Sequence, residues 1–393
     1  MINLLRKEDC CGCGACFDAC AYKAIEWKDD DEGFSYPVFN SALCRDCGLC
    51  NKVCPFINSD SINKENGDFS PIVLGAYHKD EVIRFTSTSG GAFWGLAEAF
   101  IKSGGFVAGA IWTEDFHVVH YVTNELKELE RIKGSKYVQS DCRGLYKKIR
   151  SLLRKGKKIM ATGVPCQMAA LRQFLHKDYD NLIVVDLICH SVPSPLAFQK
   201  YKGYLERSYK SQMLIYHPKN KEYGGWHNFA FKANFANGKV YSLNGCDDLF
   251  TRIFVGSGNI LSRPSCYECH FKHFPQPSDI TIGDFWGIEF IDPTFDSPNG
   301  VSKIILNNQK GKTYYESLSC FVNKYYDTET SVYKNWRSSS MIKTIPRPNM
   351  QKRKQFVSDL KTMEFQACMN KHFPKNKGIN SLIKKYIKHF FKK

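Results

Sequence analysis

Cysteine spacing is the strongest chemical signal in this sequence. Nine of the 17 cysteines fall between residues 10 and 54, in two runs that both read C-x2-C-x2-C-x3-C. In paired runs of this kind, three thiolates of one run bind a 4Fe-4S cluster, and the fourth binds the other cluster. We therefore predict two clusters, with the ligand sets Cys10, Cys13, Cys16 and Cys54, and Cys44, Cys47, Cys50 and Cys20.

Zinc and disulfides are the alternatives for these cysteines. Structural zinc sites use two separated C-x2-C pairs rather than doubled runs of four. Disulfides need an oxidising compartment, and the start of the chain lacks the apolar stretch of a secretory signal. The spacing therefore favours iron–sulfur clusters. Cys11 is surplus to the pattern and receives no role, and Ala21 stands where proline often follows the first run.

Charge is distributed unevenly along the chain. The formal net charge is +16, but residues 1–70 hold seven Lys and Arg against twelve Asp and Glu. Each cluster with four thiolates adds about two negative charges, and a bound flavin dinucleotide adds roughly two more. An acidic module beside a basic body predicts electrostatic docking within the chain or to an anionic cofactor. We predict no nucleic acid partner, because no recognised binding motif accompanies the basic residues.

The order of elements predicts a mixed fold, α+β or α/β, behind a ferredoxin-like module. Residues 1–57 form the two-cluster ferredoxin domain, with a small hairpin at residues 24–38, and the polar residues 58–71 form a linker. Strand-like and helix-like segments then alternate, which is typical of a mixed α/β domain with some parallel strands. We divide it into residues 72–150, residues 151–325 and a C-terminal extension, residues 326–393.

Hydrophobic periodicity predicts the elements of this domain. Strands are expected at residues 72–77, 106–112, 118–123, 158–162 and 182–188, in an antiparallel pair within 227–243, and last at 304–306. Helices are expected at residues 92–102, at 145–155, after a turn at 163–167 as far as residue 175, and near 312–319. Small and hydroxyl residues, Thr86–Gly91, open the first of these helices. Exposed backbone N–H groups there suit a phosphate, although an ordinary glycine turn is the simpler interpretation.

Four dispersed cysteines could bind a third 4Fe-4S cluster. Cys166 and Cys189 stand where strands give way to loops, and Cys266 and Cys269 form a C-x2-C pair. Loops at strand ends are where α/β folds place ligand sites. The simpler interpretation is that free cysteines are small buried hydrophobic residues. Cys142, Cys246, Cys320 and Cys368 lack such context and are expected to be core or surface thiols.

Residues 72–320 resemble the coenzyme F-420 hydrogenase/dehydrogenase beta-subunit family. The motifs that carry the resemblance are Thr88–Gly91, Gly134–Ser140, Gly163–Gln167, Ile188–Ser191, Cys266–Cys269 and Asp279–Gly287. Val164 and Ser191 depart from the residues that are frequent there, threonine and glycine, and this leaves the substrate open. The resemblance implies a third cluster on the dispersed cysteines. It also implies FAD contacts at Ser89, Gly90, Gly91, Ser135, Lys136 and Tyr137.

The resemblance also implies an iron–sulfur flavoprotein oxidoreductase. It would pass single electrons between ferredoxin-type clusters and FAD, and reduce or oxidise a deazaflavin or another organic substrate. Lys136 could stabilise negative charge on flavin or phosphate, or could be a solvated surface lysine. Asp279 and Asp284 could orient the cluster-bearing loops, and Trp286 is expected in the core. The rivals are a non-catalytic electron-carrier subunit of a larger redox complex and a zinc-bearing interaction module.

The C-terminal segment is strongly basic. Residues 371–393 contain eight lysines and no acidic residue, and apolar residues recur at helical spacing in 379–393. Such a helix suits peripheral contact with an anionic membrane, an acidic partner, or the protein's own domain. No stretch is long enough to span a membrane. We expect a cytoplasmic protein, with peripheral contact at the inner face of the membrane as a second possibility, and an electron-donor or acceptor protein as partner.

Overall fold

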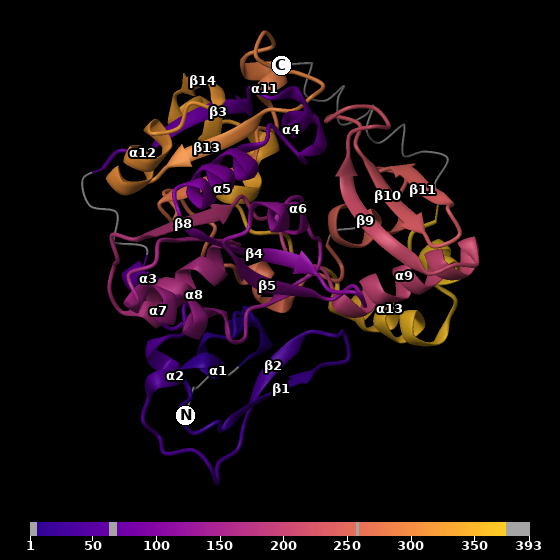
Figure 1. The fold of residues 1–393 in the computed structure, drawn as a ribbon. Coiled ribbons are helices and arrows are strands. Elements are labelled where there is room, and N and C mark those ends of the chain that lie inside the picture. The colour runs from indigo at the N-terminus through magenta and orange to yellow at the C-terminus, as the bar shows by residue number, and fades with distance from the viewer. Residues whose placement is uncertain (1–5, 63–68, 257–258, 375–393) are drawn as a thin grey trace.

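The computed structural model describes residues 6–62, 69–256 and 259–374. It has an N-terminal module, a nine-stranded sheet covered by helices, and a separate three-stranded sheet (Figure 1). The module lies at one end of the molecule, against the helices α7 (Leu145–Arg154) and α8 (Pro165–Leu175). The predicted basic helix at residues 379–393 lies outside the described residues. No helix among the described ranges has the length and apolar character needed to cross a bilayer.

The N-terminal module contains the predicted hairpin. Strands β1 (Ile25–Asp29) and β2 (Ser35–Phe39) pair antiparallel, with Ile25 opposite Phe39. Three short helices complete the module, namely α1 (Ala15–Ala19), α2 (Leu49–Lys52) and α3 (Ser59–Ile62). Helix α3 lies within the segment expected to be a linker, and Ile62 is buried against Ala169 and Phe271.

The large sheet is mixed, as the alternation of elements predicts. Its strand order is β14-β3-β13-β12-β8-β7-β4-β5-β6. The strands are β3 (Ile72–His78), β4 (Phe106–Trp112), β5 (Val118–Thr123), β6 (Ser140–Asp141), β7 (Ile159–Gly163), β8 (Leu182–Leu187), β12 (Ile280–Asp284), β13 (Ser302–Leu306) and β14 (Phe321–Tyr326). The central strands β4, β7, β8 and β12 run parallel, so their carboxyl ends meet at one edge of the sheet. The mixed α/β fold class is therefore confirmed.

The sequence pattern was wrong about where the sheet ends. Residues 304–306 were expected to be the last strand, but β14 follows β13 and pairs antiparallel with β3. Side chains on β14 are mostly exposed, with only Phe321 buried. An edge strand of this kind lacks the apolar alternation that identifies a half-buried strand.

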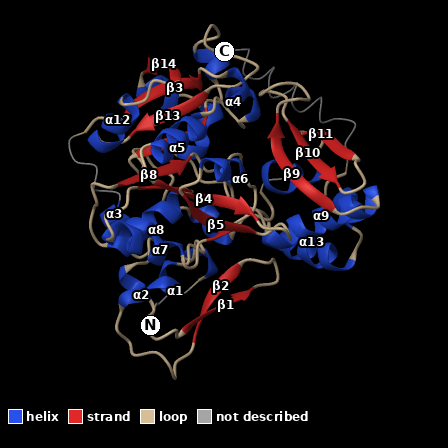
Figure 2. Cartoon of the chain, viewed as in Figure 1, coloured by secondary structure: helices blue, strands red, loops and turns tan. Residues whose placement is uncertain are grey.

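Helices cover both faces of the large sheet (Figure 2). One face packs on α5 (Ala92–Lys102) and α12 (Gln309–Glu316), with α6 (Leu129–Ile132) beside them. The other face packs on α7 and α8. Cys13, Ala15 and Val53 of the N-terminal module join this second core, so the module shares apolar packing with the body of the protein. The short helices α4 (Glu81–Thr86) and α11 (Ile288–Ile291) lie near the end of the sheet formed by β14, β3 and β13.

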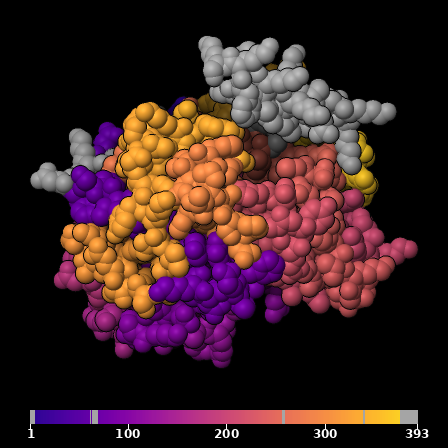
Figure 3. All heavy atoms as spheres, turned by 90° about the horizontal axis from the view of Figure 1, so that it is seen from above, coloured from indigo at the N-terminus to yellow at the C-terminus, as the bar shows by residue number. Residues whose placement is uncertain are grey.

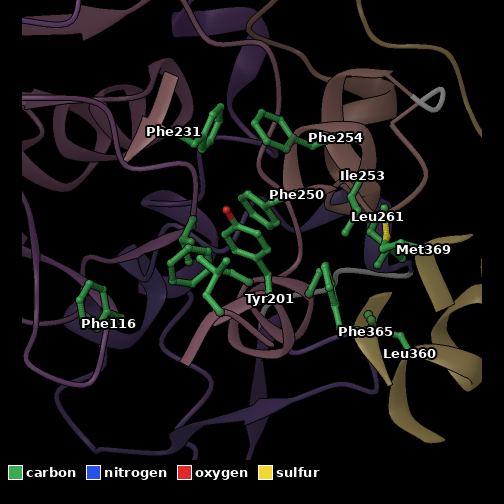
Figure 4. Close-up of a cluster of buried hydrophobic side chains, with 14 of the residues drawn as sticks. Phe116, Tyr201, Phe231, Phe250, Ile253, Phe254, Leu261, Leu360, Phe365 and Met369 are labelled. Carbon is green, nitrogen blue, oxygen red and sulfur yellow. The ribbon is translucent and has the colours of Figure 1, made fainter. Parts of the chain in front are cut away.

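The three-stranded sheet forms a second lobe with its own aromatic core. Its order is β11-β10-β9, and β10 and β11 form the antiparallel pair predicted around residues 237–238. Its elements are α9 (Pro195–Tyr209), β9 (Met213–Asn220), β10 (Ala230–Phe235), β11 (Val240–Asn244), α10 (Leu249–Thr251), α13 (Met350–Thr362) and α14 (Phe365–His372). Tyr201 and Phe250 stack at its centre with ring centroids 5.4 Å apart (Figure 4). Seen from above, violet atoms from early in the chain lie beside both the orange segments and the pink lobe (Figure 3).

Candidate functional site

The first predicted ligand set surrounds one cavity in the N-terminal module. Cys10, Cys13, Cys16 and Cys54 line it, and all four are buried. Burial raises the pKa of Cys16, and raises the pKa of Cys54 to about 12. A thiol with a raised pKa keeps its proton until a metal displaces it. Four cysteines at one cavity, which Asp9 also lines, match the number of thiolates that hold a 4Fe-4S cluster.

Glycine at position 12 allows this cavity to be assembled. Gly12 has a φ of +69°, which disfavours any other residue. A Cβ atom there would lie 2.4 Å from Gln139 Nε2 and 2.7 Å from Arg263 Cζ. The cysteine loop therefore packs directly on side chains from distant parts of the chain, and only glycine permits that approach.

The second predicted ligand set is less closely gathered. Cys20 and Cys50 pack beside Cys16 and Cys54, and the Cys20 thiol accepts a 3.3 Å hydrogen bond from the backbone N–H of Ala24. Cys44 is half-buried and Cys47 is exposed. These two cysteines lie in the loop before α2, at the surface of the module. The structure thus places the second set on the solvent side of the first.

The four dispersed cysteines line a second cavity in the body of the protein. Cys166 lies in the first turn of α8, directly after β7, and Cys189 follows β8. Because β7 and β8 are parallel neighbours, their carboxyl ends bring these two residues together. Cys266 lies in the short helical segment Pro264–Glu268, and Cys269 follows it as the C-cap. Burial raises the pKa of Cys266 to about 12 and that of Cys269 to about 11, so this donor set also fits a cluster.

Two charged side chains hold the elements that carry these cysteines. Asp279 is buried, and its carboxylate accepts hydrogen bonds from Arg172 of α8 at 2.8 Å and from the backbone N–H of Val184 in β8 at 2.7 Å. Lys272 donates to the backbone carbonyls of Cys189 and His190. Asp279 therefore joins the helix of Cys166 to the strand of Cys189, which is the orienting role considered for it from the sequence.

Cys11 lies where the cavities meet. It lines the cavity of the first ligand set, the cavity of the dispersed cysteines and a third, larger cavity described below. Its thiol interacts with those of Cys13 and Cys166, one from each set. The sequence pattern left Cys11 without a role because it falls outside the repeated spacing.

The third cavity contains most of the residues that the family resemblance implies for FAD. It encloses about 1570 Å³ of space, part of it open to solvent. Five of the six implied residues line it: Ser89, Gly91, Ser135, Lys136 and Tyr137. Gly90 is not among the lining residues. A Cβ atom at Gly90 would lie 2.5 Å from the carbonyl oxygen of Ala76, so this glycine serves close packing behind the loop.

The start of α5 faces this cavity and suits an anionic group. Gly91 is its N-cap, has a φ of +90°, and provides no side-chain cap for the first turn. Free N–H groups at the N-terminus of an 11-residue helix favour phosphate. Behind the loop, the buried ammonium of Lys221 donates to the carbonyls of Ser89, Arg84 and Asn299 at 2.6–2.7 Å. Positive charge and backbone donors therefore lie together at this end of the cavity.

Lys136 is not the solvated surface lysine considered as an alternative. Its ammonium donates to the backbone carbonyls of Ile132, Lys133 and Gly134 at 2.8–3.2 Å, at the end of α6. Burial lowers its pKa to about 7. Tyr137, the next residue, packs its ring against Phe254. Below this pKa the ammonium places positive charge beside the cavity, which fits a negatively charged cofactor.

A half-buried histidine at the same cavity, His120, has no identifying signal in the sequence. His120 Nε2 lies 3.0 Å from the carbonyl oxygen of Thr162, and its Nδ1 lies 2.9 Å from Ser140 Oγ. Gln167 donates to Ser140 Oγ at 2.9 Å and accepts from the backbone N–H of Val164 at 3.1 Å. Burial lowers the pKa of His120 to about 4, so it is neutral at pH 7. This hydrogen-bond network fixes the turn before Cys166 against residues 135–140. No local sequence pattern identifies the network, because its members are far apart in the chain.

Asp284 lines this cavity, and both Asp284 and Trp286 contact Trp226. Asp284, a lining residue, forms an ion pair with buried Lys219 and accepts a 2.9 Å hydrogen bond from Trp226 Nε1. Trp286 is half-buried and stacks on Trp226 with centroids 4.7 Å apart. Trp286 was expected in the core, but its side chain is only half-buried.

Comparison with known proteins identifies both parts of the chain. Residues 156–332 match the family model for the C terminus of the coenzyme F420 hydrogenase/dehydrogenase beta subunit, and residues 9–58 match the 4Fe-4S dicluster domain. An uncharacterized ferredoxin of Methanocaldococcus jannaschii is 33% identical over 52 residues, which are 13% of this chain and 66% of that protein. An uncharacterized protein of the same organism is 25% identical over 202 residues, which are 44% of this chain and 54% of that protein. The chain therefore spans less than two thirds of the length of both relatives.

A solved structure also aligns with this chain. It belongs to the F420-reducing [NiFe] hydrogenase complex of Methanosarcina barkeri, with 16% identity and a TM-score of 0.43, over 76% of this chain and 90% of that chain. The two matching family models thus assign residues 156–332 to the C-terminal domain of the coenzyme F420 hydrogenase/dehydrogenase beta-subunit family and residues 9–58 to the 4Fe-4S dicluster domain.

Proposed function

We propose that the protein is an iron–sulfur flavoprotein oxidoreductase that exchanges single electrons with a partner protein and two electrons with an organic substrate. The observation that carries this proposal is the contact between the cavities. The cavity of the dispersed cysteines and the larger cavity share lining residues, among them Cys166 and Cys189. Cys11 lines both of these cavities and also the cavity of the first ligand set. Sites for single-electron carriers and a site for a two-electron cofactor are thus adjacent.

The residues present fit three 4Fe-4S clusters and FAD. The cluster ligands would be the two sets in the N-terminal module and the set Cys166, Cys189, Cys266 and Cys269. The start of α5 would hold the phosphates of FAD, and Lys136 would place positive charge beside the cofactor. When bound, the clusters would carry single electrons, and the flavin would convert them to a two-electron change.

The chain's own residues perform the remaining tasks. Asp279 and Lys272 hold the cysteine-bearing segments, and His120 orients the turn before Cys166 as a neutral hydrogen-bonding group. Cys47 and the half-buried Cys44 lie at the surface, which suits electron exchange with a docked partner protein. A deazaflavin is the substrate class that the family name suggests, and other organic acceptors are equally compatible with this cavity.

Anaerobic purification tests the proposal. We expect about twelve iron atoms per chain, since each of three clusters contributes four. We also expect flavin absorption bands above a broad iron–sulfur shoulder, and FAD released on acid treatment. Iron without flavin would indicate the electron-carrier subunit instead. A chain without iron would refute the proposal.

A further inference from the structure

Arg263 is the most deeply buried cation beside the predicted clusters. Its side chain is 1% exposed, although it lies just before the segment that carries Cys266. The guanidinium donates hydrogen bonds to the Cys10 carbonyl oxygen at 2.8 Å, to Ser35 O at 3.0 Å and to Gln139 Oε1 at 2.7 Å. Its Nη2 also lies 3.7 Å from Cys10 Sγ. One cation thus contacts the cysteine loop, the β1–β2 hairpin and Gln139, which lines the third, larger cavity.

The charge of Arg263 has no carboxylate partner among the described residues. Every hydrogen-bond acceptor it reaches there is a neutral carbonyl, an amide oxygen or a cysteine sulfur. The ring of Tyr36, with its centroid 4.4 Å from Cζ, adds only a cation–π contact. Burying an unpaired charge is strongly unfavourable, so a counter-ion is expected within reach.

Arg353 shows how this protein otherwise buries a guanidinium. It is also 1% exposed, but it forms an ion pair with Glu32 and donates to Tyr267 at 2.6 Å. The difference between the two arginines is the nature of the neighbouring anion. Around Arg263 the groups able to carry negative charge are cysteine sulfurs, with Cys10 closest and Cys11 and Cys266 also nearby.

We propose that Arg263 is the counter-ion of the cluster on Cys10, Cys13, Cys16 and Cys54, and that it sets the reduction potential of that cluster. This inference rests on the proposed function, because it requires the cluster to be present. Reduction adds one negative charge to an anionic cluster, and a neighbouring cation stabilises the reduced form more than the oxidised form. Arg263 therefore raises the potential of this cluster relative to the one on Cys44, Cys47, Cys50 and Cys20.

The test is a redox titration of the full-length protein, purified anaerobically and followed by electron paramagnetic resonance. C16S identifies the signal of the first cluster. We expect R263Q to lower the equilibrium constant for reduction of this cluster at least tenfold. For a one-electron couple, this is a shift of the reduction potential of about 59 mV to lower values. R263K keeps the positive charge but cannot reproduce the branched hydrogen bonds, and should restore most of the potential. R353Q is the matched control and should leave this potential unchanged.

Iron analysis of each variant separates the outcomes. If R263Q lacks the first cluster while R263K retains it, charge compensation is also supported. If R263Q and R263K shift the potential equally, leave it unchanged, or both lose the cluster, Arg263 has only a packing role and the inference is overturned. If the unaltered protein binds no iron, the proposed function itself fails, which is a different result.

Discussion

The carboxylate of Asp18 caps a helix, α7, whose N-cap residue lies 126 residues further along the chain. It accepts hydrogen bonds from the backbone N–H groups of Gly144 at 2.7 Å and Tyr146 at 3.1 Å, in the first turn of α7. In return, the Tyr146 hydroxyl donates to the Cys13 carbonyl oxygen at 2.8 Å. Gly144, the N-cap residue, has no side chain to provide a cap. These contacts fasten the N-terminal module to the body of the protein.

Replacing Asp18 by alanine should loosen this attachment. The substitution leaves backbone N–H groups of α7 without an acceptor, and loss of an N-cap costs about 1–2 kcal/mol. We expect a lower free energy of unfolding in urea and faster proteolytic cleavage after the module. Asp60→Ala, at an exposed position of the same module, should change neither quantity. Equal stability of D18A and the unaltered protein would show that the cap does not matter.

Replacing Gly12 by alanine should disrupt the first ligand set. The new methyl group would meet Gln139 and Arg263 well inside contact distance, in addition to the strain of a positive φ. Gly48→Ala is a matched control, because Gly48 has a φ of +71° and open space around it. We expect G12A to lose about four iron atoms per chain and G48A to keep them. Equal loss of iron from both variants would assign the effect to backbone strain alone, and full iron content in G12A would contradict the prediction.

Iron content should also show whether the dispersed cysteines bind a cluster. Cys269→Ser is expected to lower iron by about four atoms per chain, the content of one cluster. Cys246→Ser should leave iron unchanged, because this exposed thiol lines none of the three cavities. An unchanged iron content in C269S would remove the third cluster from the proposal.

Replacing Lys136 by glutamine should weaken FAD binding. The ammonium donates to three backbone carbonyls, so the substitution acts by removing positive charge beside the anionic cofactor, and the dissociation constant should rise about several-fold. The pKa of Lys136 is lowered to about 7, so raising the pH through 7 should weaken binding in the unaltered protein. K136Q should lose this pH dependence. Quenching of FAD fluorescence measures both effects, and identical titrations for the two proteins would contradict them.

Lys303 predicts a pH dependence of stability away from the cysteines. It is fully buried in β13, donates to the Ser331 carbonyl oxygen at 2.6 Å, and has a pKa lowered by burial to about 7. Between this value and its ordinary pKa of 10.5, the unfolded chain binds the proton and the folded chain does not. Stability should therefore rise with pH across that interval, by up to about 1.4 kcal/mol per pH unit.

Lys303→Met tests this linkage. The variant should be more stable at pH 7 by about 1–3 kcal/mol, because it no longer buries an unpaired ammonium. It should also lose the rise in stability between pH 7 and pH 10, measured by urea unfolding. Lys239→Met, at an exposed position, should keep the pH slope of the unaltered protein. The same slope in K303M and the unaltered protein would refute the assignment.

Local pattern determined much of this protein. The cysteine runs need only spacing within one loop, and the hairpin at residues 25–39 and strands β4 and β5 follow from short-range alternation of apolar residues. Helix α5 begins and ends where its periodicity predicts, because helical hydrogen bonds join residues four apart. The mixed α/β class follows from the order of such elements.

Tertiary structure alone decided which of these elements meet. Arg263 lies 253 residues from Cys10 and Asp18 lies 128 from Tyr146, distances at which no periodicity operates. Cys11 lies outside the repeated spacing, yet it lies where three cavities join. Such contacts depend on the order of strands in the sheet and on which helix face the module covers, and those are set by burial of the whole chain rather than by any one segment.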